Sequence, residues 1–267
     1  MKNSQINQKK WLVKIYETMM IGGKSTQTFL NYKSHISRFL KYYPENTDEL
    51  MDIIAYRISK TKEKDFNDID TSKITDMSYL FAMKNLKSIC KMSAFDLRDR
   101  LLEININDWD VSNVENMEHM FDTSPITVLN FDFSNWDVSN VTNMYKMFYQ
   151  CNSFTGKGLN KWNTSSLENA ESMFNGCNYF NENIGNWNVS NLKNSSFMFA
   201  GCYKFNQDLS KWDISNINDM QSMFIYCEQL KQDFSTWNID QNKVDCYTMF
   251  KGCNKMKDEL LPKGITI

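Results

Sequence analysis

Apolar and polar positions repeat along most of this chain with a period of about 25 residues, which is typical of repeat proteins. A tryptophan followed by Asp or Asn opens each copy, and the spacing between these tryptophans becomes constant in the last four copies: Trp109, Trp136, Trp162, Trp187, Trp212 and Trp237. A Met-Phe pair follows each one, with its phenylalanine at Phe121, Phe148, Phe174, Phe199, Phe224 and Phe250. A fixed period in this range indicates an array of stacked repeats.

A third landmark is a cysteine three residues after each of the last five phenylalanines: Cys151, Cys177, Cys202, Cys227 and Cys253. With the Trp and Phe positions, these cysteines form the predicted structural core of the repeat. The chain has seven cysteines, an odd number, and five share one repeat position, so a column of buried, reduced thiols is favoured over a disulfide framework. Stacked neighbours could still lie close enough for a disulfide, which keeps oxidation open as an alternative.

The spacing within one copy predicts two short elements. Apolar residues fall at steps of 3, 3, 1 and 3 in the copy that begins at Trp212: Ile217, Met220, Met223, Phe224 and Cys227. These steps place all five on one side of a helix of about ten residues. Before them, Trp212 and Ile214 alternate with polar residues, as in a very short strand. A single copy is too short to enclose a core alone, so the strands are expected to stack in parallel.

The expected fold class is therefore an α/β repeat solenoid, with one very short parallel strand and one short helix in each repeat. A degenerate copy at residues 69–81 has Ile69 in place of Trp, so the array of about seven repeats is assigned to residues 66–257. An insertion occupies about residues 82–105, where a binding loop is expected as much as a disordered or capping excursion. Residues 258–267 form a C-terminal tail or cap.

Residues 1–65 are expected to form a helical head that caps the solenoid. Apolar residues recur at helical spacing over residues 29–43 and stop at Pro44, and a second helix is expected after Thr47, whose hydroxyl could cap it. The head carries 12 Lys/Arg and 7 Asp/Glu, which leaves 18 and 25 for the rest of the chain. An acidic array argues against a nucleic-acid surface, which should be basic.

The sequence gives no support for catalysis or for a cofactor. Gly23, Lys24 and Ser25 resemble the end of a phosphate-binding loop, but that motif needs a glycine where Thr18 stands. A faint likeness of residues 28–43 to the arm-type domain of tyrosine recombinases is not followed by catalytic residues. The two histidines, His35 and His119, have no nucleophile at a recognisable motif spacing. We expect that the protein is not an enzyme.

Repeated polar residues beside the strand have two interpretations. Ser-Asn pairs such as Ser139/Asn140 could form ladders of side-chain hydrogen bonds from coil to coil. Calcium binding by Asp110, Asp137 and Asp213 is the functional alternative, but neutral Asn occupies the same place in three other copies, and calcium sites need several carboxylates. The sequence therefore predicts no metal site.

No secretory signal, lipid-anchored N-terminal cysteine or membrane-spanning segment is found in the sequence. Lys14 and Glu17 interrupt the apolar patch near the N-terminus, and no apolar run approaches the roughly 18 residues of a membrane span. By sequence alone the protein is expected to be cytoplasmic.

The motif W-[DN]-V-S-N-V-x-N-M-x-x-M-F-x-x-C-x-x-F at residues 136–154, with its degenerate form at residues 69–81, resembles the BspA-type leucine-rich-repeat-like surface protein family. The resemblance covers about residues 50–257 and implies a right-handed, leucine-rich-repeat-like solenoid. It also implies adhesion and binding of host matrix proteins, a surface or secreted location for many members, and no catalytic residues.

The expected function is a non-enzymatic protein-protein interaction or adhesion module that binds a host or cell-surface ligand. The alternative is a structural or antigenically variable repeat scaffold without a dedicated ligand. Core, capping and ladder positions use up the invariant residues, so specificity is expected in the variable positions, the 82–105 insertion and the basic head. The identity of the protein ligand and the oligomeric state are left open.

Overall fold

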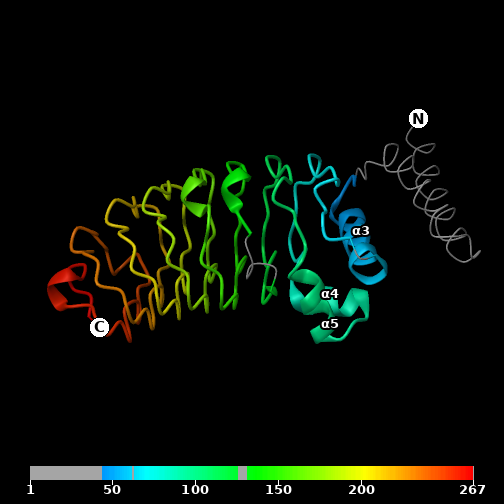
Figure 1. The fold of residues 1–267 in the computed structure, drawn as a ribbon. Coiled ribbons are helices and arrows are strands. Elements are labelled where there is room, and N and C mark those ends of the chain that lie inside the picture. The colour runs from blue at the N-terminus through cyan, green and yellow to red at the C-terminus, as the bar shows by residue number, and fades with distance from the viewer. Residues whose placement is uncertain (1–43, 62, 126–130, 267) are drawn as a thin grey trace, which may run out of the picture. The chain divides into compact units, whose positions relative to one another are not determined.

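The computed structural model of the chain describes residues 44–61, 63–125 and 131–266. From residue 44 onward these residues form a stack of coils, with helix α3 at one end and the C-terminal tail at the other (Figure 1). The predicted helix at residues 29–43, the likeness to a phosphate-binding loop at Gly23 to Ser25, and His35 lie outside the described residues.

Helix α3 (Thr47–Lys60) covers the first coil. Its N-cap is Asn46, whose side chain accepts a hydrogen bond from the Glu49 N–H at 3.0 Å, so the expectation that Thr47 caps this helix is wrong. The Thr47 hydroxyl donates to the carbonyl oxygen of Asp76 in the first coil. Leu50 and Ile54 are fully buried, which gives the helix the apolar face that a cap requires.

The insertion after the first coil contains two short helices, α4 (Met83–Cys90) and α5 (Ala94–Leu101), which pack against α3 and against each other. Ser93 caps α5 by accepting from the Asp96 N–H at 3.1 Å. Leu86, Leu97 and Leu101 are fully buried. The insertion therefore contributes to the apolar cap at this end of the stack.

The repeats themselves contain neither the predicted strand nor the predicted helix. Within the described residues, all three α-helices precede Leu102, and parallel pairing consists of seven isolated bridges. Short 3-10 turns occur later, at η2 (Phe133–Asn135), η3 (Leu159–Lys161) and η4 (Asp258–Leu260). The α/β solenoid with one strand and one helix per repeat is therefore wrong.

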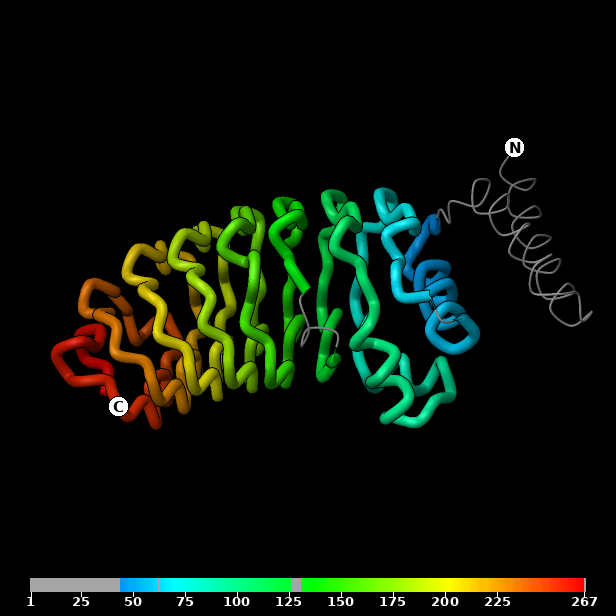
Figure 2. Tube along the Cα trace, viewed as in Figure 1, coloured from blue at the N-terminus to red at the C-terminus, as the bar shows by residue number. Residues whose placement is uncertain are grey.

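Seven coils stack through a run of eight residues that we call the turn segment (Figure 2). The seven turn segments are residues 76–83, 116–123, 143–150, 169–176, 194–201, 219–226 and 245–252. The first residue of each is an Asn or Asp that forms a parallel bridge with the same position in the adjacent coil. Coils 1 to 7 are numbered in this order below.

Two left-handed residues in each turn segment of coils 2 to 7 prevent the helix. In coil 3 they are Lys146 at φ 52° and Gln150 at φ 56°, and the other coils repeat the pattern. A non-glycine residue in this region costs about 1–2 kcal/mol, and an α-helix cannot pass through it. The apolar steps of 3, 3, 1 and 3 are therefore produced by consecutive tight turns.

Backbone hydrogen bonds to the next coil offset that cost. In coil 4, alternate N–H groups donate forward: Ala170 to Asn194 O, Ser172 to Ser196 O, Phe174 to Met198 O and Gly176 to Ala200 O, at 2.8–2.9 Å. The N–H groups between them close turns within the coil, such as Met173 to Ala170 O at 3.2 Å. Every second N–H thus joins neighbouring coils, as in a parallel sheet.

Candidate functional site

The Trp, Phe and Cys residues that the sequence places in the core are all buried, with at most 4 % of any of them exposed. One phenylalanine of each coil stacks on that of the next. The ring centroid of Phe174 lies 5.7 Å from that of Phe148 in the preceding coil and 5.7 Å from that of Phe199 in the following coil. Such pairs add about 0.5–1.5 kcal/mol beyond the area that they bury. These residues are therefore occupied in packing.

Four of the six repeat tryptophans, Trp109, Trp162, Trp187 and Trp212, donate an indole hydrogen bond to the preceding coil. The Nε1–H of Trp187 donates to the Leu159 carbonyl oxygen at 2.8 Å, and that of Trp162 donates to Phe133 O at 3.0 Å. The buried Nε1 of Trp136 and of Trp237 has no acceptor among the described residues. The tryptophan column therefore contributes hydrogen bonds as well as apolar area.

The cysteine thiols are also structural. Each of the five repeat cysteines lies 3.0–3.1 Å from the carbonyl oxygen of the core phenylalanine in the preceding coil, as Cys177 does from Phe148 O. None of the seven cysteines, all of which lie in the described ranges, forms a disulfide. Burial raises the pKa of Cys177 and Cys202 well above the usual thiol value, which suppresses the reactive thiolate.

The repeated Asp and Asn residues have local partners. The Asp137 side chain accepts from the Ser139 N–H at 3.0 Å, and neutral Asn188 makes the same bond to Ser190 at 3.0 Å. The Asn140 side-chain amide donates to the Ser112 carbonyl oxygen of the preceding coil at 2.7 Å. No group of three metal-ligating side chains occurs in the described ranges. The repeated Asp and Asn side chains therefore take part in local turns and in hydrogen bonds between coils, and these contacts do not involve a metal.

A different kind of cluster lies on the outer surface of coils 1 to 3. At the first left-handed position these coils carry Tyr79, His119 and Lys146, flanked by Tyr145 and Tyr149. The Tyr79 and His119 rings stack with centroids 4.6 Å apart, and Tyr145 meets His119 edge-on at 5.1 Å. We call these five residues the aromatic-histidine cluster.

Lys146 extends the cluster across the third coil. Its Nζ atom lies 4.8 Å from the ring centroid of Tyr145 and 5.2 Å from that of Tyr149. Interaction with the Tyr145 side chain raises the pKa of the Lys146 ammonium, while partial burial opposes this rise. The cation is thus held between two aromatic rings and stays charged at neutral pH.

Two carboxylates fix the orientation of the rings. The Tyr79 hydroxyl donates to Glu118 Oε1 at 2.9 Å, and His119 Nδ1 lies 2.6 Å from Asp122 Oδ2. Burial, followed by the Glu118 hydrogen bond, raises the pKa of Tyr79 to about 12. Tyr79 is therefore a neutral hydrogen-bond donor at physiological pH, and 41 % of its surface remains exposed.

The same position in later coils shows that the cluster departs from the repeat. Ser172 in coil 4 and Ser222 in coil 6 occupy it and are buried, whereas coils 5 and 7 have Phe197 and Thr248 there. Large amphipathic side chains are thus not required for coil stacking. The repeat motif leaves this position variable, so these five residues do not stand out as a site in the sequence. Tyr79, His119 and Lys146 do occupy one repeat position in successive copies, and that shared position was the signal that could have found them.

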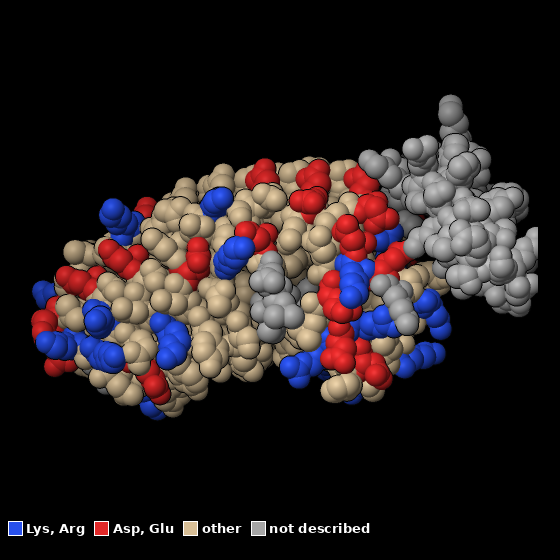
Figure 3. Space-filling view, in the orientation of Figure 1, with Lys and Arg blue, Asp and Glu red and all other residues tan. Residues whose placement is uncertain are grey.

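The sequence predicted no catalytic role for His119. Its Nδ1 lies 2.6 Å from Asp122 Oδ2, and its ring makes one stacked contact with Tyr79 and one T-shaped contact with Tyr145. Figure 3 shows that acidic and basic side chains are interspersed on this view of the stack, with a largely uncharged middle. This view shows no broad basic face of the kind that nucleic acids require.

The stacked coils define a repeat protein, and no recognisable catalytic constellation occurs in the described ranges. The chain belongs to the family described as Mycoplasma protein of unknown function, DUF285, which matches residues 50–157 and 151–262. No curated protein and no solved structure matches the chain. Among the described residues, no helix is long and apolar enough to cross a membrane.

Proposed function

We propose that this protein is a non-enzymatic protein-protein interaction module and that the aromatic-histidine cluster is its recognition surface. The observation that carries the proposal is that three adjacent coils place Tyr79, His119 and Lys146 at one variable repeat position, where their side chains contact one another and neighbouring tyrosines. At this position coils 4 and 6 have buried serines, and coils 5 and 7 have Phe197 and Thr248. Coils 4 to 7 stack through the same backbone hydrogen bonds without such a cluster, so coil stacking alone does not account for these side chains.

The chemistry of the cluster suits a protein ligand. Tyrosine combines a large rigid contact area with a polar tip, and such residues dominate the energetics of protein interfaces. The rings are held by Glu118 and Asp122, which lowers the entropy lost on binding. The resemblance to the BspA-type family supports a host or cell-surface protein as the ligand.

Serine substitutions provide a mild test, because serine is already present at the same position in coils 4 and 6. The triple variant Tyr79→Ser, His119→Ser, Lys146→Ser should keep the coil stack. The full chain and this variant would be immobilised and exposed to solubilised host-cell surface and matrix proteins, and captured proteins would then be purified and their affinities measured. We expect affinity for the true ligand to fall at least about 100-fold, given two or more lost aromatic contacts.

A matched control replaces two exposed tyrosines outside the cluster, Tyr179→Ser and Tyr203→Ser. This control should bind like the unmodified chain. Equal binding by the triple variant would show that the cluster is not the recognition surface. Absence of any saturable ligand would favour the alternative, a structural or antigenically variable scaffold.

A further inference from the structure

The last coil presents a row of unpaired backbone N–H groups. In coils 1 to 6, the second, fourth, sixth and eighth N–H groups of each turn segment donate to the next coil. The equivalent groups in coil 7 belong to Cys246, Thr248, Phe250 and Gly252, and they have no acceptor among the described residues. The turns within coil 7 are nevertheless formed, since Met249 N–H donates to Cys246 O at 3.1 Å. This edge has the conformation of a paired coil without a partner.

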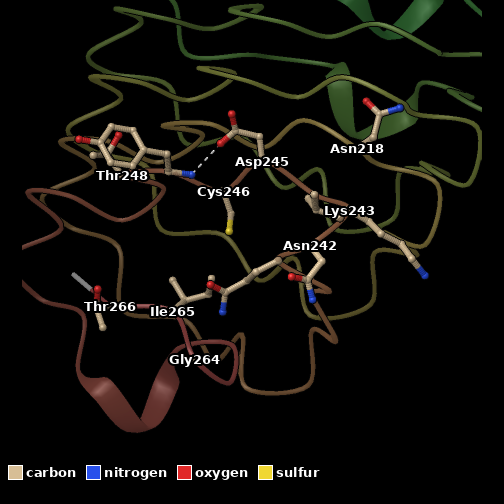
Figure 4. Close-up of a pocket in the computed structure, with 12 residues that line it drawn as sticks. Asn218, Asn242, Lys243, Asp245, Cys246, Thr248, Gly264, Ile265 and Thr266 are labelled. Carbon is tan, nitrogen blue, oxygen red and sulfur yellow. Dashed lines mark hydrogen bonds between the residues drawn. The ribbon is translucent and has the colours of Figure 1, made fainter.

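A cleft of about 590 Å³ lies in front of this edge. Cys246, Tyr247 and Thr248 line one side, and Gly264 and Ile265 of the C-terminal tail line the other. In Figure 4 the Cys246 sulfur points into the space between the two. The space is therefore bounded by the backbone edge and by a second segment of chain.

Among the described residues, the backbone of the C-terminal tail pairs with the last coil only outside residues 246–252. The Phe234 N–H of the last coil donates to the Leu260 carbonyl oxygen at 2.8 Å, so the residues of η4 continue the stack there. At the opposite end, α3 covers the first coil, and the Thr47 hydroxyl donates a hydrogen bond to the Asp76 carbonyl oxygen. The open row at residues 246–252 is thus a local feature of the C-terminal end.

The polarity of the edge determines what can bind to it. The forward-facing backbone groups of the turn segment are donors, and the Val244 carbonyl oxygen just before it is an acceptor, since its equivalents accept from the next coil. A second copy cannot pair through its own C-terminal edge, because donors would face donors. It also cannot pair through its N-terminal edge while α3 covers that edge. The complementary occupant must present carbonyl oxygens at alternate residues.

We propose that residues 246–252 bind a polypeptide segment of a partner protein that adds to the stack as an eighth coil, parallel to coil 7. The partner segment has the chemistry of the repeat itself. It places Asn or Asp opposite Asp245, as every bridge between turn segments does, and a small or apolar residue opposite Cys246. The equivalents of Cys246 in coils 2 to 6 are Met, Met, Ala, Ser and Met, which defines the tolerated sizes. Backbone addition of this kind is an established mode of peptide recognition.

Hydrogen exchange on the full chain provides the test, with a synthetic peptide of residues 216–229 of this sequence as the probe. In the absence of peptide, the four edge amides should exchange at least about 100-fold faster than their equivalents in coil 5, Ser195, Phe197, Phe199 and Gly201. Saturating peptide should slow the four edge amides by at least about tenfold. A scrambled peptide of the same composition should leave them unchanged. Slow exchange of the four amides without peptide, or no protection with it, would overturn the proposal.

Substitution at Cys246 separates edge addition from binding elsewhere. Cys246→Arg places a charge against the incoming segment and should abolish the protection, whereas Cys246→Ser should retain it, because Ser195 occupies this position in coil 5. Peptide protection that persists in a folded Cys246→Arg protein would refute the edge as the binding site. If Cys246→Arg fails to fold, the location of the protected amides in the unmodified chain decides the question. The aromatic-histidine cluster is intact in both variants, so this test is independent of the proposed function.

Discussion

The thiol of Cys177 donates a hydrogen bond to the carbonyl oxygen of Phe148 in the preceding coil, with Sγ and O 3.0 Å apart. The same oxygen accepts from the Cys151 N–H, also at 3.0 Å. One carbonyl group thus closes a turn in its own coil and joins the next coil. The bond recurs in the last five repeats and explains why a cysteine occupies this position.

Replacing Cys177 by alanine should therefore lower the free energy of unfolding by about 1–2 kcal/mol. The loss combines a small cavity with the missing S–H bond, while the Phe148 oxygen keeps its second partner. Urea denaturation measures the change. The matched control is Cys246→Ala, which removes a half-buried thiol that has no hydrogen-bond partner among the described residues and should change stability by less than about 0.5 kcal/mol. Equal effects at the two positions would count against a structural role for the S–H bond.

The thiol column should make the protein less stable in alkali. Burial raises the pKa of Cys177, Cys202 and Cys227 well above the usual value and that of Cys253 to about 12. In the unfolded chain thiols ionise with a pKa of about 8.5, so above that pH the folded state binds more protons than the unfolded state. The free energy of unfolding is then unaffected below about pH 8 and falls above it, by up to about 1.4 kcal/mol per pH unit for each buried thiol.

Urea denaturation between pH 7.5 and 10 tests this dependence. A Cys202→Ala, Cys227→Ala variant is the control, and its stability should decline with pH less steeply than that of the unmodified chain. A decline of equal slope in the two proteins would show that these thiols are not its cause.

The contribution of an indole hydrogen bond to the free energy of unfolding can be measured by comparing substitutions of two buried tryptophans. Trp187→Phe removes the bond to Leu159 O, whereas Trp136→Phe removes an Nε1–H that has no acceptor among the described residues. Both changes delete similar apolar area, so the difference isolates the hydrogen bond. We expect Trp187→Phe to destabilise the protein by about 1–2 kcal/mol more than Trp136→Phe in thermal or urea unfolding. The reverse order would contradict the assignment.

Two left-handed glycines should differ in their tolerance of alanine. A Cβ atom on Gly158, at φ 91°, would lie 2.5 Å from the backbone nitrogen of Ser134, whereas one on Gly201, at φ 70°, would meet nothing closer than 3.8 Å. Gly201→Ala should cost about 1 kcal/mol for the backbone conformation alone, and Gly158→Ala about 3 kcal/mol because of the added clash. Similar stabilities of the two variants would show that the coils shift freely relative to each other.

The sequence predicted the repeat and its core residues, because stacked coils impose the same buried position on Trp, Phe and Cys in every copy. It did not predict the backbone. Apolar steps of 3, 3, 1 and 3 are shared by a helix and by consecutive turns, and the first left-handed position carries residues such as Lys146, Phe197 and Ser222 in place of the glycine that would reveal it. Within the turn segments, glycine occurs only at the second left-handed position, at Gly176, Gly201 and Gly252, where it also fits the C-terminal end of a helix. The bonds to the next coil stabilise these conformations and cannot be seen in a single repeat.

The sequence does not predict the aromatic-histidine cluster, for a related reason. Tyr79, His119 and Lys146 are neighbours only because residues 82–105 form α4 and α5 and leave the coil register intact across the insertion. The sequence predicts specificity in the variable positions, the 82–105 insertion and the basic head, without selecting particular residues. Which variable residues lie together on one surface depends on the register between coils. The backbone hydrogen bonds between successive turn segments, which we call the backbone ladder, set this register.

Scalar couplings across hydrogen bonds test the ladder most directly. In a deuterated, isotope-labelled full chain, NMR can detect the coupling between an amide nitrogen and the carbonyl carbon that accepts its proton. The structure predicts a correlation from the Phe174 nitrogen to the Met198 carbonyl carbon of the next coil, whose oxygen lies 2.9 Å away. A correlation from Phe174 to the Ala170 carbonyl carbon, as an α-helix requires, would contradict this account of the fold.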